Sequence, residues 1–226
     1  MRELRKHWRL AAILVAVQVL TSTVPLVVWF TYGPRLDDGW LVAIADRSSP
    51  LLVMCWLWLL APTLIATGAY WVSESRDRFC LEVWRHASYR DWLARRVAYL
   101  AALPALAFGV GLAPWLVVRH PVDAAGALSV AGLLVLYAWA LSLLLVGLTF
   151  AGLPPTLALL AALLAHAVDL SLEVAGMQGP LHFFLLGEGG GAFSALATVA
   201  LCAACLFLLF RITSVASLAR REGDPV

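Results

Sequence analysis

Three ionisable residues of one apolar segment are the strongest candidates for chemistry: His166, Asp169 and Glu173. Their spacing of i, i+3 and i+7 places them on one face of an α-helix. A charged side chain at the centre of a bilayer costs about 2.5–3.5 kcal/mol, so this face is not expected to contact lipid. Three interpretations follow: a transport cavity or subunit interface, structural pairing inside a helix bundle, and proton transfer or metal binding. The first is preferred, and the third is the least favoured, because three ligands on one helix seldom converge on a metal ion unaided.

Other residue patterns associated with chemistry are weak or missing. Cys202 and Cys205 form a C-x-x-C pattern inside an apolar helix, where a packing role is expected in place of a redox or zinc site. A phosphate-binding loop of the form G-x-x-x-x-G-K-[ST] is absent from the sequence, because Lys6 is the only lysine. We therefore expect no catalytic residue, no cofactor and no metal ion in this chain, and no enzymatic activity of its own.

The composition identifies the setting in which these residues must be positioned. Of 226 residues, 62% are hydrophobic and only 13% are charged, which does not fit a water-soluble domain. Intrinsic disorder, collagen and a disulfide scaffold are excluded for the same reason, together with the low count of four cysteines. A formal net charge of +2 gives no reason to expect a nucleic-acid partner. The sequence predicts an integral membrane protein in contact with the lipid bilayer.

Charge-free windows of about 20 residues indicate where helices cross the bilayer. One apolar run, from Ala124 to Ala167, is about twice that length, and Gly152-Leu153-Pro154-Pro155 is expected to divide it. The predicted fold is all-α, a polytopic membrane protein with six transmembrane helices and no separate domain. The spans are predicted at 10–32, 49–72, 97–118, 126–151, 156–176 and 191–211.

The basic residues indicate the orientation of these spans. Of the 16 Lys and Arg, all but Arg35, Arg47 and Arg119 lie at the amino terminus, in the segment 74–96, or at the carboxyl end. The positive-inside rule therefore places both termini and the segment 74–96 in the cytoplasm. The first apolar run is too long for a signal peptide and is expected to stay as the first helix. The Arg-, Ala- and Leu-rich composition suggests a bacterial protein, located in the inner (plasma) membrane.

The segment 74–96 is the only long cytoplasmic loop in this topology. Leu81, Trp84, Ser88 and Trp92 recur in it at helical spacing with charges between them. This pattern is typical of an amphipathic helix that lies on the membrane surface or docks in a partner's groove. The alternative is a solvated connector.

The layout of the chain resembles the ABC-2-type permease family. The likeness lies in the order of a basic amino terminus, two helices, the charged run Glu74-Ser75-Arg76-Asp77-Arg78 with Leu81-Glu82 after it, and a third helix. The chain departs from the family at Phe79-Cys80, where many relatives carry Gly-Thr. The resemblance implies that the loop holds a coupling helix that fits a cleft in a separate ATPase subunit. The contact residues implied are Leu81, Glu82, Trp84, Arg85, Tyr89 and Asp91.

The same resemblance implies the assembly and the activity. Two ATPase copies would bind ATP and Mg, and a second permease copy or a paralogue would complete the transport path. The complex would export a hydrophobic, lipid-like, peptide or drug substrate. The outer segment 177–190 reads as a short re-entrant or interfacial helix, and the family carries such helices as caps on the pathway. An aromatic belt loop is the alternative to this outer gate. The gate residues would be Pro180, His182, Phe183 and Phe184.

Two other functions compete with the exporter. A membrane anchor subunit of a respiratory or haem-handling complex would use helix-borne histidines as iron ligands, but His166 is the only histidine well inside a predicted span. A proton-coupled secondary transporter would use His166, Asp169 and Glu173, and it predicts inverted repeats that the sequence does not show.

Overall fold

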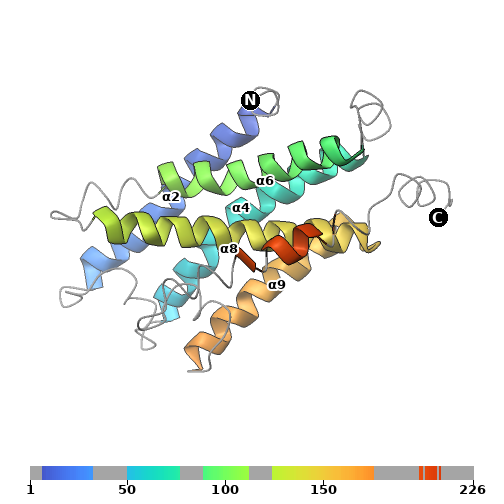
Figure 1. Ribbon diagram of the computed structural model, residues 1–226. Helices are drawn as coiled ribbons and strands as arrows, with labels where there is room; N and C mark the ends of the chain where they lie inside the picture. The colour runs from blue at the N-terminus through green and yellow to red at the C-terminus, as the bar shows by residue number, and fades with distance from the viewer. Residues whose placement is uncertain are drawn as a thin grey trace.

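The computed structural model describes residues 7–32, 50–76, 89–111, 124–175, 199–200, 202–207 and 209. Five long helices account for most of them, and the described part contains no strand (Figure 1). The all-α prediction is therefore confirmed for this part of the chain. The helices are α2 (Trp8–Tyr32), α4 (Pro50–Arg76), α6 (Tyr89–Gly111), α8 (Ala124–Phe150) and α9 (Pro155–Val174).

Long runs of Leu and Ala explain why these segments are helices, because such side chains bury no polar group and lose little freedom in a helix. Each helix has between 20 and 27 residues. Two stretches with described side chains, Arg90–Gly111 and Ala131–Phe150, are long and apolar enough to cross a membrane. Trp8–Thr23 and Pro155–Asp169 are shorter apolar helices by the same measure.

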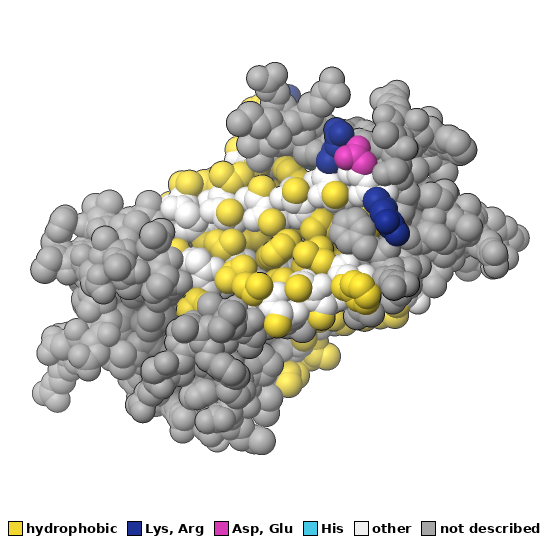
Figure 2. Space-filling model, viewed as in Figure 1, with side chains coloured by type: hydrophobic (Ala, Val, Ile, Leu, Met, Phe, Trp, Pro, Cys, Tyr) yellow, Lys and Arg dark blue, Asp and Glu magenta, His cyan; other side chains and the backbone are white. Residues whose placement is uncertain are grey.

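Helix α4 lies at the centre of the bundle and contacts each of the other four (Figure 1). The remaining helices form a row in which α2 contacts α6, α6 contacts α8, and α8 contacts α9. Polar side chains are buried between the helices, among them Gln18, Thr67 and Ser142, whereas Ile13, Leu20 and other large apolar side chains are more than 60% exposed. Figure 2 shows hydrophobic side chains over the middle of one face, with the described charged side chains toward one end. The core is mainly hydrophobic, but many large apolar side chains are also exposed on the described helices.

Aromatic contacts gather the ends of four helices at one end of the bundle. The His7 and Tyr70 ring centroids are 5.0 Å apart, which joins the start of α2 to the end of α4. Trp71 lies 6.3 Å from Trp92 on α6 and 5.4 Å from Phe150 on α8. We call these residues, together with Tyr99, the aromatic end. Consecutive helices from α2 to α8 therefore run antiparallel.

Helices α2 and α6 also approach each other closely at the end of the bundle opposite the aromatic end. The Ser22 hydroxyl donates to the Gly111 carbonyl oxygen, and a Cβ added at Gly111 would overlap the Gln18 side chain. The Gln18 amide in turn donates to the Leu59 carbonyl of α4 over 2.8 Å. Glycine at 111 is thus required by space.

The break predicted at Gly152-Leu153-Pro154-Pro155 is present between α8 and α9. Gly152 has a φ of 103°, a left-handed conformation that glycine adopts without a Cβ penalty. The Leu153 N–H donates to the Leu148 carbonyl and the Gly152 N–H to the Thr149 carbonyl, the two bonds of a Schellman motif. Pro155 is the first residue of α9, where the missing N–H costs nothing. The turn folds α8 and α9 into a hairpin.

The start of the third helix differs from the prediction. The predicted loop 74–96 would delay this helix to residue 97, but α6 begins at Tyr89. Trp92, Leu93 and Arg96 are almost fully buried on its inner face. Charge counting placed the boundary too late, because it assumed that an arginine beside a span lies outside the packed helix. Residues 77–88 of the loop lie outside the described part.

The third helix also ends at Gly111, seven residues before the predicted limit of 118, whereas the limits of the other four helices lie within four residues of the predicted spans. Of the sixth predicted span, 191–211, residues 202–207 are helical. The outer segment 177–190 lies outside the described residues. Cys202 belongs to the core and Cys205 packs against it, which agrees with the packing role predicted for this pair.

Candidate functional site

Two buried polar clusters are the candidates for function. The first joins α8 to α9 and consists of Tyr137, His166 and Asp169, here called the Tyr137 cluster. The Tyr137 hydroxyl donates to Oδ2 of Asp169 over 2.8 Å. The Tyr137 hydroxyl oxygen also lies 3.3 Å from Nδ1 of His166. The two rings meet edge to face with centroids 5.8 Å apart. All three side chains are at most 4% exposed.

The direction of these bonds follows from the proton on the phenol. Because Tyr137 gives its only hydroxyl proton to Asp169, its oxygen can only accept from His166. That contact requires a proton on Nδ1 of the imidazole. The cluster is therefore an ordered hydrogen-bond chain from imidazole to phenol to carboxylate. Such a chain satisfies groups that would be costly to bury alone, and it also has the composition of a proton relay.

The structure thus brings together two of the three residues singled out on this helix. His166 and Asp169 turn inward, as predicted, and they pair with another helix of the same chain, which is the second of the three interpretations. Glu173 lies on α9, but its side chain is outside the described part. Among the described residues, no group of three or more His, Cys, Asp or Glu could hold a metal ion.

Tyr137 was missed because nothing in the apolar run 124–150 distinguishes it as a functional residue. A signal was nevertheless present in the hairpin itself. Tyr137 and His166 lie at nearly equal distances along the chain from Gly152, on opposite sides of it. In an antiparallel helix pair, residues equidistant from the turn lie at the same height, so a search across the turn would have found this partner.

The second cluster surrounds Arg96 at the aromatic end. Arg96 is 1% exposed, and its Nη1 donates to the Tyr70 hydroxyl over 3.3 Å. Its guanidinium carbon lies 5.7 Å from the centroid of the Trp92 ring, within the range of a cation–π contact. The Tyr70 and Tyr99 rings are 4.4 Å apart, and His7 packs on both. We call Arg96, Trp92, Tyr70, Tyr99 and His7 the Arg96 cluster.

Arginine keeps its charge at any accessible pH, so the Arg96 cluster holds a permanent buried cation. Among the described residues, the Tyr70 hydroxyl and the Trp92 ring face contact this guanidinium, and both can stabilise a cation. The cluster draws on α2, α4 and α6, and Trp71 extends it to α8 by donating from Nε1 to the Thr149 hydroxyl over 2.8 Å. Sequence reasoning assigned Arg96 to the cytoplasmic loop 74–96 and did not anticipate this packing.

The predicted coupling residues are described only in part. Leu81, Glu82, Trp84 and Arg85 lie outside the described residues. Tyr89 is the first residue of α6, and Asp91 in the first turn forms a 3.0 Å ion pair with Arg95. Both side chains of this pair are at least 40% exposed, so the pair contributes little to stability. The predicted gate residues, Pro180, His182, Phe183 and Phe184, are also outside the described part.

Comparison of the chain with protein-family models, with curated proteins and with solved structures gives no match.

Proposed function

We propose that this chain is the membrane subunit of an ATP-driven exporter of the ABC-2 permease type, with ATP hydrolysed on a separate chain. The observation that carries the proposal is the packed joint at the aromatic end. The charged segment of the sequence joins the end of α4 to the start of α6. At the aromatic end these two helices are packed together by Trp71, Trp92 and Arg96. A partner that binds this segment would therefore act on the bundle through a rigid contact.

The membrane location is part of the proposal. It is supported by the exposed apolar side chains around buried polar ones and by the two stretches with the length and hydropathy of a membrane span. Arg9, Arg90 and Arg95 lie near the helix ends that meet at the aromatic end of the bundle. The positive-inside rule makes this the cytoplasmic side of a bacterial plasma membrane. We propose six spans with both termini in the cytoplasm, as the charge pattern of the sequence predicts.

The joint also suggests how a push on the segment would travel. Packed interiors resist gradual deformation and move as units, so a displaced α6 start would carry its neighbours with it. The path to α2 runs through Tyr99 and His7, and the path to α8 runs through Trp71 and Thr149. Export by alternating access needs this kind of concerted helix movement. Two copies of the chain, or one copy and a paralogue, would form the transport path.

Purification of the native complex tests the proposal. The full chain, tagged at its carboxyl end and produced at its natural level in its own host, should copurify with a nucleotide-binding ATPase in equal amounts. Trp84→Ala should release that ATPase while membrane insertion is retained. Trp58→Ala is the matched control, because Trp58 is 58% exposed on α4 and lies outside the aromatic end. A native complex without a nucleotide-binding subunit would overturn the exporter proposal.

The Tyr137 cluster favours a second candidate, a proton-coupled secondary transporter. An ordered imidazole–phenol–carboxylate chain inside a helix bundle is the arrangement that proton relays use. Efflux of a hydrophobic dye from everted vesicles distinguishes the two candidates. ATP-dependent efflux that survives a protonophore supports the exporter. Efflux by this chain alone that the protonophore abolishes, and that Asp169→Asn also abolishes, supports the secondary transporter.

A further inference from the structure

Helix α4, at the centre of the bundle, carries a proline in its interior. Pro62 lies four residues after Trp58 in this helix. Because proline has no N–H, the Trp58 carbonyl cannot receive the usual helical bond from residue 62, and the proline ring crowds this carbonyl. Prolines are among the few positions at which helices bend sharply. The turn from Trp58 to Pro62 is therefore the weakest described turn of α4.

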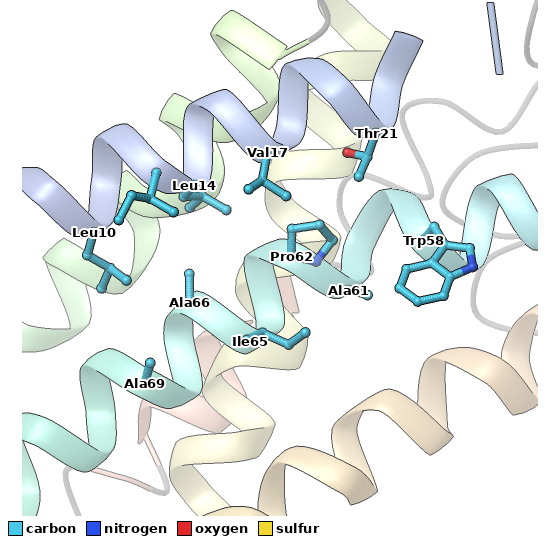
Figure 3. Close-up of a pocket in the computed structure, with 11 residues that line it drawn as sticks. Leu10, Leu14, Val17, Thr21, Trp58, Ala61, Pro62, Ile65, Ala66 and Ala69 are labelled. Atoms are coloured by element: carbon cyan, nitrogen blue, oxygen red, sulfur yellow. The ribbon is translucent and has the colours of Figure 1, made fainter. Parts of the chain in front are cut away.

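The position of Pro62 on the helix sets the direction in which α4 would bend. Figure 3 shows Pro62 on the side of α4 that faces α2, with Val17 opposite it. Both residues line an apolar groove, so the side chains do not fill the space between the two helices at this point. The crowding between ring and carbonyl opens the helix on the side of the proline. A bend at Pro62 would therefore carry the first part of α4 away from α2.

Gln18 of α2 contacts the same region of α4 and opposes this bend. Its Nε2 donates to the Leu59 carbonyl oxygen over 2.8 Å, and the Thr63 hydroxyl donates to its Oε1 over a long 3.5 Å. Leu59 precedes Pro62 by three residues, and Thr63 follows it directly. One side-chain amide thus contacts α4 on both sides of the proline.

A third helix holds the Gln18 side chain in place. Gln18 is fully buried, and Gly111 of α6 lies so close to its Cβ and Cγ that an added Cβ would overlap them. Ser22, one turn further along α2, donates to the Gly111 carbonyl. A buried amide that loses its partner finds no water to replace it, so the free amide is costly. The contact between Gln18 and Leu59 is therefore either made in full or released by a movement of the helices.

The part of α4 that follows Pro62 is held by other bonds. The Thr67 and Ser142 hydroxyls are 3.2 Å apart, and Trp71 donates to the Thr149 hydroxyl over 2.8 Å. Both bonds join α4 to α8 on the side of Pro62 that leads to the aromatic end. Before Pro62, the bond from Gln18 to Leu59 is the one interhelical hydrogen bond of α4 among the described residues. The two parts of α4 thus depend on different helices.

We propose that α4 bends at Pro62 and that Gln18 is the latch that holds the bend closed. When Gln18 releases Leu59, the first part of α4 moves away from α2 while the second part stays packed at the aromatic end. Because α4 contacts each of the other four helices, this movement opens the bundle at the end opposite the aromatic end. The hinge is a property of the bundle itself and does not depend on a substrate, a partner or an energy source.

Hydrogen exchange of the full chain in detergent micelles tests the proposal, because exchange rates report how often a helical turn opens. Gln18→Met keeps an unbranched side chain of similar length beside Gly111 and removes both polar contacts. It should raise the exchange rates of the amides in 59–66 about tenfold, the effect of losing a buried hydrogen bond. Pro62→Ala supplies the missing N–H and removes the ring. In a Pro62→Ala background, Gln18→Met should therefore change these rates less than about twofold.

Two controls separate a latch from a bond that only stabilises the bundle. Thr67→Val removes a buried interhelical bond of the same helix beyond the proline, and its effect on exchange should be equal with and without Pro62→Ala. Pro104→Ala removes the proline inside α6 and should leave the effect of Gln18→Met unchanged. An effect of Gln18→Met that is absent, that is spread evenly over all five helices, or that persists with Pro62→Ala refutes the latch. Pro62→Ala alone should slow exchange in 59–66, and unchanged rates there refute the hinge even if Gln18→Met does not fold.

Discussion

The Tyr137 and Arg96 clusters bury polar groups in the same bundle by different means. The Tyr137 cluster uses two helices that are consecutive in the chain, and hydrogen bonds satisfy its carboxylate and imidazole. The Arg96 cluster uses three helices and places a permanent cation beside a hydroxyl and aromatic faces. The first depends on the register of one hairpin, and the second depends on assembly of the bundle. This difference predicts which mutations disturb one contact and which disturb several.

Loss of the buried cation should have the largest effect. Arg96→Ala removes a fully buried side chain and leaves the Tyr70 hydroxyl and the Trp92 face without it, so the free energy of unfolding should fall by about 3 kcal/mol. Unfolding in detergent micelles titrated with dodecyl sulfate measures this. Arg95→Ala, one residue earlier and exposed, should cost less than about 0.5 kcal/mol. Equal effects of the two variants would mean that Arg96 does not hold the joint.

Removal of the Tyr137 hydroxyl should have the second-largest effect on stability. Tyr137→Phe keeps the ring but takes away the bond to Asp169 and the acceptor for His166, so we expect a loss of about 2 kcal/mol in the same assay. Tyr99→Phe is the control in the other cluster, since the Tyr99 hydroxyl makes a long 3.5 Å bond to the His7 carbonyl, and it should cost less than about 0.5 kcal/mol. A double-mutant cycle of Tyr137→Phe with Asp169→Asn should show coupling of about 1 kcal/mol. Additive effects would show that the two side chains do not interact.

Strain in the α8–α9 turn should have a smaller effect. Gly152→Ala places a Cβ at a φ of 103° and should destabilise the chain by about 1 kcal/mol. Leu153→Ala, the exposed neighbour, should cost less. Because the turn sets the register of the Tyr137 cluster only, Gly152→Ala should reduce the coupling between Tyr137 and Asp169 and leave the effect of Arg96→Ala unchanged. A changed effect of Arg96→Ala would show that the two clusters are not independent.

The surface ion pair should matter least for stability. Asp91→Asn removes the 3.0 Å contact with Arg95 and should lower the free energy of unfolding by about 0.3 kcal/mol, as expected for an exposed i, i+4 pair. The same variant tests the predicted coupling role of Asp91, because docking of the ATPase should weaken without loss of stability. A loss of stability as large as that of Arg96→Ala would place Asp91 in the packed joint.

Much of the fold was accessible from the sequence because it depends on local properties. Long apolar runs without charges produce helices wherever they occur, and a Gly-Leu-Pro-Pro sequence ends one helix and starts the next in any context. The i, i+3 spacing of His166 and Asp169 likewise predicted a shared inward face, because polar side chains on an apolar helix avoid an apolar exterior. These predictions needed no knowledge of which helices are neighbours.

The partners of the buried polar groups were decided by the tertiary structure. Tyr137 becomes a partner of Asp169 only because the hairpin sets the two residues at one height, and no property of residue 137 alone announces this. Arg96 carries a charge that predicts a loop when residues are counted along the chain, yet it is buried, in contact with Tyr70 of α4 and Trp92 of its own helix. The cost of burying a charge depends on its surroundings, and surroundings are a property of the packed bundle. The sequence therefore determined the helices and their inward faces, and the packing determined what those faces hold.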